Sequence, residues 1–285
     1  MTEKIALLVD SGSDVPPRLI AEKDNLRIVP LQITIDGQTY ADGQKITPAE
    51  FYQRQAAAAE LPKTASPTMG DIMTQIDDLK AGGYTHVIGI TMSAALSVTN
   101  NAFQQAADSQ TDVTMSVINT QSIGIGSGLF AVYAEDLIEA GDSFNSIVAK
   151  LDAAIPHSHV YFYIPTLTYL RAGGRIGRVA GLVGSALSIK PVITCDEEGV
   201  YTTIARARTE KKAIDKMIAL AVDDIKSHNQ VRVAVANGDN EPLMDTIIEQ
   251  LHTQFPQLTI ETGEISAALG AHTGPGLVGI TVQAD

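Results

Sequence analysis

Two hydrophobic patterns alternate along the first half of the chain. Short apolar runs rich in β-branched residues indicate strands, and longer segments with apolar residues three or four positions apart indicate helices. Thr47-Pro48-Ala49-Glu50 is a capping box with proline at the first helical position, so we expect a helix to begin there. The predicted strands are 4–9, 27–35, 38–40, 85–90 and 114–118, and the predicted helices are a short one after Pro16-Pro17 and 48–59, 69–80, 97–107 and 123–139.

The same alternation starts again near Ser158. Strands are predicted at 159–164, 187–194, 199–205, 231–236, 259–264 and 278–283, and helices at 209–226 and 241–253. Strands that alternate with helices are typical of parallel sheets with crossover helices. We therefore predict an α/β protein with two α/β domains, residues 1–157 and 158–285. No flexible linker separates them, so a fixed interface is expected, and such interfaces often hold ligands.

Composition narrows the class of protein. The 285 residues are 45% hydrophobic and 19% charged, which is a globular composition, and 20 Lys+Arg against 33 Asp+Glu give a formal net charge of −13. An anionic surface repels phosphate backbones, so we expect no nucleic-acid partner. The single cysteine, the lack of a signal-peptide pattern and the lack of a long apolar run lead us to expect a cytoplasmic protein without stable membrane insertion.

Several kinds of catalytic machinery are missing from the sequence. No phosphate-binding P-loop, no G-x-S-x-G nucleophile elbow and no HExxH zinc motif is present. Residues 124–128 are glycine-rich, but their spacing fails the dinucleotide fingerprint and favours a helix start packed closely on a neighbour. His157 and His159 are two positions apart and could chelate a metal, but ordinary surface histidines are the simpler interpretation. We predict no cofactor and no metal site.

Four segments are hard to explain by folding alone. Residues 61–68 carry several hydroxyls before a helix, and residues 90–100 place Ser93 just after a strand, where ligands gather in α/β sheets. Residues 170–177 place an arginine in a glycine turn, and residues 270–276 do the same for a histidine. Helix capping could account for some of the hydroxyls, and solvation for the arginine.

Together these segments resemble the DegV family of bacterial fatty-acid-binding proteins. The resemblance runs through the whole chain and includes Asp10-Ser11-Gly12-Ser13-Asp14, Leu61-Pro62-Lys63-Thr64, Gly173-Gly174-Arg175-Ile176, Ile189-Lys190-Pro191 and His272-Thr273-Gly274-Pro275-Gly276. It implies two α/β domains with a long-chain fatty acid between them as the bound ligand.

The resemblance also implies roles for individual residues. Matched position by position, Thr64 and Ser93 would hold the fatty-acid carboxylate, and Arg175, His272 and Ser97 would lie at the pocket mouth near the head group or a partner. Some members resemble the lipid-presenting, non-catalytic subunit of a fatty-acid kinase. In that arrangement a separate ATP-binding subunit phosphorylates the carboxylate, and the acyl phosphate feeds phospholipid synthesis.

The sequence departs from the family pattern around the head group. Ala94 replaces the second serine of a Ser-Ser pair, Val98 replaces a glycine, and Asn119 replaces an aspartate. An alternative hypothesis is therefore a stand-alone lipid binder or sensor without a kinase partner. A third hypothesis is a hydrolase that uses Asp10, Asp14, Ser93 and His272, although no spacing between a base and a nucleophile can be read from the chain.

Overall fold

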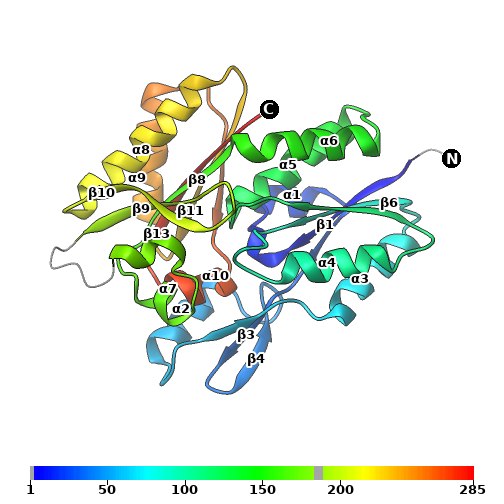
Figure 1. Ribbon diagram of the computed structural model, residues 1–285, viewed down its shortest axis with the longest axis horizontal. Helices are drawn as coiled ribbons and strands as arrows, with labels where there is room; N and C mark the ends of the chain where they lie inside the picture. Colours follow the sequence, from blue (N-terminus) through cyan, green and yellow to red (C-terminus); the bar gives the residue numbers. More distant parts are fainter. Residues whose placement is uncertain (1–2, 183–188) are drawn as a thin grey trace.

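The computed structural model describes residues 3–182 and 189–285. Its first half is built on a four-stranded parallel sheet in the order β2-β1-β6-β7 (Figure 1). Helices α3 and α4 cover one face of this sheet, and α5 covers the other. The elements are β1 (Ile5–Asp10), α1 (Pro17–Glu22), β2 (Leu26–Val29), α3 (Met69–Ala81), β6 (His86–Thr91), α4 (Thr99–Asp108), β7 (Thr114–Asn119), α5 (Ile125–Glu139) and α6 (Phe144–Ala154).

A small antiparallel sheet in the order β4-β3-β5 projects from the first half, below it in Figure 1. It consists of β3 (Gln32–Ile35), β4 (Gln38–Ala41) and β5 (Lys63–Ala65), and α2 (Pro48–Ala57) follows β4. The expected capping box of α2 is present, since the Thr47 side chain accepts a hydrogen bond from the Glu50 N–H and the Glu50 side chain accepts one from the Thr47 N–H. The strand predicted at 27–35 is divided near Pro30, which has no N–H to donate, and its two parts join different sheets.

The second half is built on a six-stranded sheet in the order β10-β9-β8-β13-β11-β12. Among the described strands of this sheet, only β11 and β12 pair in parallel, so the expectation of a second parallel sheet is wrong. The last strand inserts between β8 and β11, and α8 and α9 pack on one face of the sheet. The elements are β8 (Ser158–Tyr163), α7 (Thr168–Ala172), β9 (Lys190–Cys195), β10 (Tyr201–Ala207), α8 (Glu210–Ser227), β11 (Val231–Gly238), α9 (Glu241–Gln254), β12 (Ile260–Glu264), α10 (Ala267–Thr273) and β13 (Leu277–Ala284), with 3₁₀ turns at Ser11–Ser13, Ile155–His157 and Gly177–Leu182.

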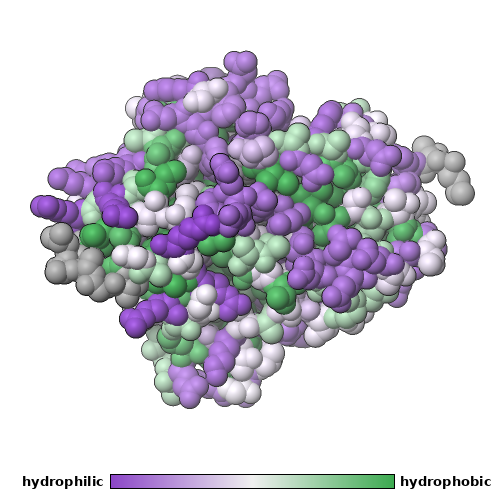
Figure 2. All heavy atoms as spheres, in the orientation of Figure 1, coloured by the Kyte–Doolittle hydropathy of each residue, from purple (hydrophilic) through white to green (hydrophobic). Residues whose placement is uncertain are grey.

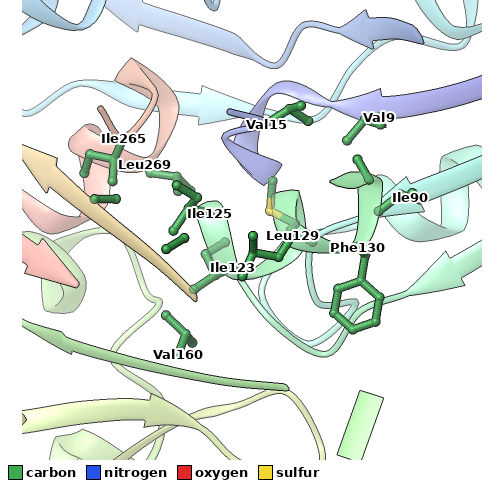
Figure 3. Packing of buried hydrophobic residues seen from close by; sticks show 14 of the residues in the cluster. Val9, Val15, Ile90, Ile123, Ile125, Leu129, Phe130, Val160, Ile265 and Leu269 are labelled. Atoms are coloured by element: carbon green, nitrogen blue, oxygen red, sulfur yellow. The ribbon is translucent and has the colours of Figure 1, made fainter. Parts of the chain in front are cut away.

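One hydrophobic core joins the two halves. Helix α5 lies between the sheets and contacts β1 and β6 on one side and β8, β11 and β13 on the other. Figure 3 shows Ile123, Ile125, Leu129 and Phe130 running from the first sheet towards α10 and β8. Gly126 and Gly128 allow the start of α5 to pack closely on its neighbours. A Cβ at Gly126 would lie 2.4 Å from the Ser122 hydroxyl, and a Cβ at Gly128 would lie 2.5 Å from the Ser13 carbonyl oxygen. The glycine-rich segment is thus a tightly packed helix start, as predicted.

The chain enters the second sheet at Ser158, where β8 begins. Helix α5 from the first half nevertheless also packs on the second sheet. The boundary at 157/158 therefore stays a prediction. On the face seen in Figure 2, hydrophilic residues predominate and hydrophobic residues reach the surface in separate patches. Among the described helices, none is long and apolar enough to cross a membrane.

Candidate functional site

A cavity of about 290 Å³ lies where β5, the turn after β6 and α10 meet. Residues from both halves of the chain line it: Leu31, Thr64, Ala65, Ser66, Met92, Leu96, Ser97, Val98, Ile123, Arg175, Tyr201, Ala268, Leu269, His272 and Thr273. The structure thus brings together four of the five residues that the sequence singled out, namely Thr64, Ser97, Arg175 and His272.

The cavity has a polar end and an apolar end. At the polar end, Thr64, Arg175 and His272 also line a neighbouring hollow of about 360 Å³, whose wall includes Lys63 and Tyr169. At the other side the cavity adjoins a smaller chamber of about 40 Å³ whose walls are almost entirely hydrocarbon. A ligand with a polar head and an apolar tail matches this arrangement.

Thr64 and His272 form the centre of the polar end. The Thr64 hydroxyl lies 2.7 Å from Nε2 of His272, and the two residues are 208 positions apart in the sequence. Burial, with the Arg175 cation as a lesser cause, lowers the pKa of His272 to about 4, so the imidazole is neutral at pH 7. Its Nδ1 has no hydrogen-bond partner among the described residues and lies against Gly173, where a Cβ would come within 2.1 Å of it.

Arg175 is exposed and is one of the residues that line the cavity. Its Nη1 donates to the Gly173 carbonyl at 2.7 Å, and its Nε donates to the Leu96 carbonyl at 3.4 Å. The bond to Leu96 joins the turn after α7 to the turn after β6, whereas the bond to Gly173 stays within the turn after α7. Arg175 is therefore the cation nearest to Thr64 and His272 among the residues that line the cavity, and it remains open to solvent.

Ser93 is placed differently from the other candidates. It is fully buried and does not line the cavity, because its hydroxyl donates to the Gly199 carbonyl at 2.9 Å in the β9–β10 turn. Ala94 next to it is exposed, and Val98 is 63% exposed at the start of α4. Asn119 accepts a hydrogen bond from the Ala94 N–H and so helps to hold this turn. A role for Ser93 in holding a carboxylate stays a prediction.

Three buried carboxyl groups lie next to the cavity wall. Asp10 accepts a hydrogen bond from the Met92 N–H at 2.8 Å, and Asp14 accepts one from the Ser266 N–H at 2.9 Å at the start of α10. Burial raises the pKa of Asp10 to about 7 and that of Asp42 to about 6, and it raises the pKa of Asp14 well above its usual value. Asp10 thus joins β1 to the turn after β6, and Asp14 joins the segment after β1 to the start of α10, the helix that carries His272.

The arrangement does not form the hydrolase site considered above. His272 contacts Thr64, Ser93 contacts Gly199, and the carboxylates of Asp10 and Asp14 contact backbone N–H groups. No base therefore hydrogen-bonds the Ser93 hydroxyl in the described part of the chain. Within the same residues no His, Cys, Asp and Glu cluster could hold a metal ion, and His159 instead bonds Asp224 at 2.9 Å.

The helix that carries His272 is not among the elements predicted from the sequence. Residues 270–276 were predicted to form a glycine turn, but His272 lies in the last turn of α10, which spans Ala267–Thr273. The available signal was Ser266, whose side chain caps the helix, followed by Ala267-Ala268-Leu269. Tyr201 was also missed; it is buried and lines both the cavity and the apolar chamber.

Comparisons with known proteins agree with this architecture. A family described as "Uncharacterised protein, DegV family" matches residues 4–285. A DegV domain-containing protein of Clostridium acetobutylicum is 36% identical over 280 residues, covering 98% of this chain and 99% of its own. A solved structure described as fatty acid binding of a DegV family protein from Thermus thermophilus has a TM-score of 0.90 at 28% identity, covering 99% of this chain and 100% of its own.

A further solved structure is the fatty acid kinase B3 protein of Streptococcus pneumoniae, loaded with linoleic acid. It has a TM-score of 0.84 at 23% identity and covers 99% of this chain and 100% of its own, which shows a shared fold. The match to the family extends over nearly the full length, and the two-domain α/β fold is common to the neighbours. The chain belongs to the DegV family.

Proposed function

We propose that this protein binds one long-chain fatty acid in the cytoplasm, with the carboxylate beside Thr64 and the acyl chain in the apolar part of the cavity. The observation that carries the proposal is the polarity of the cavity, which has Thr64, His272 and Arg175 at one end and a hydrocarbon chamber at the other. The description of the Thermus thermophilus relative as fatty-acid-binding supports the same ligand class.

The energetics favour a site in which the tail sets affinity and the head group sets orientation. Burying about fourteen methylenes of a sixteen-carbon acid contributes at most about 11 kcal/mol. Each hydrogen bond to a carboxylate adds about 1.5–3 kcal/mol, and association costs about 4–15 kcal/mol. Neutral hydroxyl donors are therefore sufficient at the head group, and a buried arginine is not needed.

The contact between Thr64 and His272 can orient the hydroxyl towards a ligand. When Nε2 of His272 carries the ring proton, it donates to the Thr64 oxygen, and the Thr64 hydroxyl proton is then free for the carboxylate. Because His272 is neutral at pH 7, it adds no fixed positive charge at this point. In this proposal Ser93 is a second donor, which requires its hydroxyl to leave the Gly199 carbonyl when lipid binds.

The binding proposal is tested with delipidated protein and palmitate in isothermal titration calorimetry. Thr64→Val keeps the β-branched shape suited to β5 but removes the donor, and palmitate should bind at least tenfold more weakly. Thr253→Val, at an exposed position of α9, is the matched control and should leave binding unchanged. Equal palmitate affinity in wild type and Thr64→Val would refute the head-group assignment.

We further propose that the bound fatty acid is presented to a separate ATP-binding kinase subunit. Arg175 is exposed and lines the cavity, where it could contact a partner and a newly added phosphate. Arg175→Ala should bind palmitate like wild type but give less acyl phosphate with a kinase subunit and ATP. Normal acyl-phosphate formation by this variant would contradict the role of Arg175. A failure of wild type with its cognate kinase subunit would favour the stand-alone binder or sensor, which the exposed Val98 and the replacement at Ala94 motivate.

A further inference from the structure

The small chamber beyond the main cavity is bounded by hydrocarbon. It shares Ile123, Tyr201, Leu269 and Thr273 with the cavity, so these four residues lie between the two spaces. The Thr273 hydroxyl is already used, since it donates to the Leu269 carbonyl at 3.1 Å. Figure 3 shows Ile125, Leu269 and Ile265 close together, with Ile123 and Val160 beyond them. Such a chamber offers water few partners and suits an apolar group.

The floor of the chamber is a row of residues across three adjacent strands. Ala236 on β11 pairs directly with Gly279 on β13, and Gly279 pairs directly with Phe162 on β8. Directly paired residues point to the same face of a sheet, and all three line the chamber. Ala236 and Gly279, two of the smallest residues, are thus adjacent, and the chamber lies where larger side chains would extend from these positions.

Backbone geometry does not require a glycine at position 279. Gly279 is not among the residues with positive φ, and a Cβ there would lie 3.3 Å from the Phe162 Cβ and 3.4 Å from the Tyr161 carbonyl oxygen, so Phe162 would have to shift slightly to admit it. Ala236 is in a regular strand where β-branched residues are favoured. The chamber lies directly beside these two small residues, and protein interiors rarely leave such space unfilled.

We infer that the methyl end of the acyl chain occupies this chamber, and that Ala236 and Gly279 set the longest chain that the protein accepts. The inference rests on the proposed fatty-acid binding and specifies it. A chain that enters at Thr64 must pass Tyr201, whose ring packs edge-on against Phe162 with centroids 5.2 Å apart. Beyond this aromatic pair, the acyl chain ends against β11 and β13.

The test compares straight saturated acids of 10, 12, 14, 16 and 18 carbons on delipidated wild type, Ala236→Val and Gly279→Ala. Each buried methylene changes affinity about fourfold, so displacing about two of them should weaken the binding of the longest acid that wild type accepts by about 15-fold. Acids two to four carbons shorter should bind as in wild type. Gly70→Ala, at an exposed position with room for a Cβ, is the control and should keep the wild-type profile.

Each other outcome has a defined meaning. An unchanged chain-length profile in both chamber variants, with thermal unfolding showing that both are folded, overturns the inference and leaves the proposed binding intact. Equal weakening of all five acids also overturns it, because the residues would then act on the whole site. If wild type binds none of the acids, both the proposed function and the inference fail.

Discussion

Replacing Asp10 by asparagine should change how the stability of this protein depends on pH. Asp10 is fully buried at the end of β1, where its carboxylate accepts the Met92 N–H, and Asp14 and Asp42 are nearby. Desolvation raises its pKa from 3.8 to about 7, with the Asp42 charge as a lesser cause. Asparagine keeps the acceptor oxygen and the approximate shape of the carboxyl group but cannot ionise.

The sign and magnitude follow from proton linkage. The folded state binds this proton more tightly than the unfolded state, so the resulting stabilisation is fully present below about pH 4 and is lost as pH rises through about 7. A pKa raised from 3.8 to about 7 corresponds to about 4 kcal/mol. The free energy of unfolding of wild type minus that of Asp10→Asn should therefore fall by up to about 4 kcal/mol between pH 4 and pH 8.

The assay is urea unfolding followed by far-UV circular dichroism at constant ionic strength, since the chain contains no tryptophan. Asp245→Asn, at an exposed position of α9, is the matched control and should give a difference that stays flat with pH. The reasoning is refuted if the difference between wild type and Asp10→Asn also stays constant within about 1 kcal/mol over this range. Asp10 would then ionise equally easily in both states.

Two glycine substitutions test the contacts around the site. Gly199→Ala should lower the free energy of unfolding by about 1–3 kcal/mol in thermal or urea unfolding, because φ is +73° and the Cβ would lie 2.1 Å from the Ser93 Oγ. Gly43→Ala, with φ of +69° and nothing within 4 Å of its Cβ, is the control that measures the backbone cost alone. Equal losses of stability in the two variants would exclude a contribution from the contact with Ser93. Gly173→Ala should weaken palmitate binding about tenfold in calorimetry, because displacing His272 would leave the Thr64 hydroxyl unoriented and cost about one hydrogen bond to the charged carboxylate. The control for Gly173→Ala is Gly181→Ala, which has open space at its Cβ, and equal palmitate affinities in these two variants would contradict the role of His272.

The sequence by itself determined most elements and their approximate bounds. The capping residues Thr47 and Glu50 satisfy the first N–H groups of α2 locally, so the start of that helix could be read without its surroundings. The β-branched runs that became β1, β6, β7 and β11 were predicted within two residues at either end. The segments around Thr64, Arg175 and His272 stand out through their family pattern and line one cavity in the structure, and their roles there stay predictions.

The tertiary structure decided how these elements combine, because the deciding contacts join residues far apart in the chain. Strand β13 lies between β8 and β11, which makes most of the second sheet antiparallel, and nothing local in residues 277–284 indicates that position. The neutral state of His272 follows from burial against Gly173 and Thr64, and the Ser93 hydroxyl is bound by a carbonyl 106 residues away. The apolar chamber is likewise lined by residues far apart in the chain, among them Ala236 and Gly279, which pairing between β11 and β13 makes neighbours.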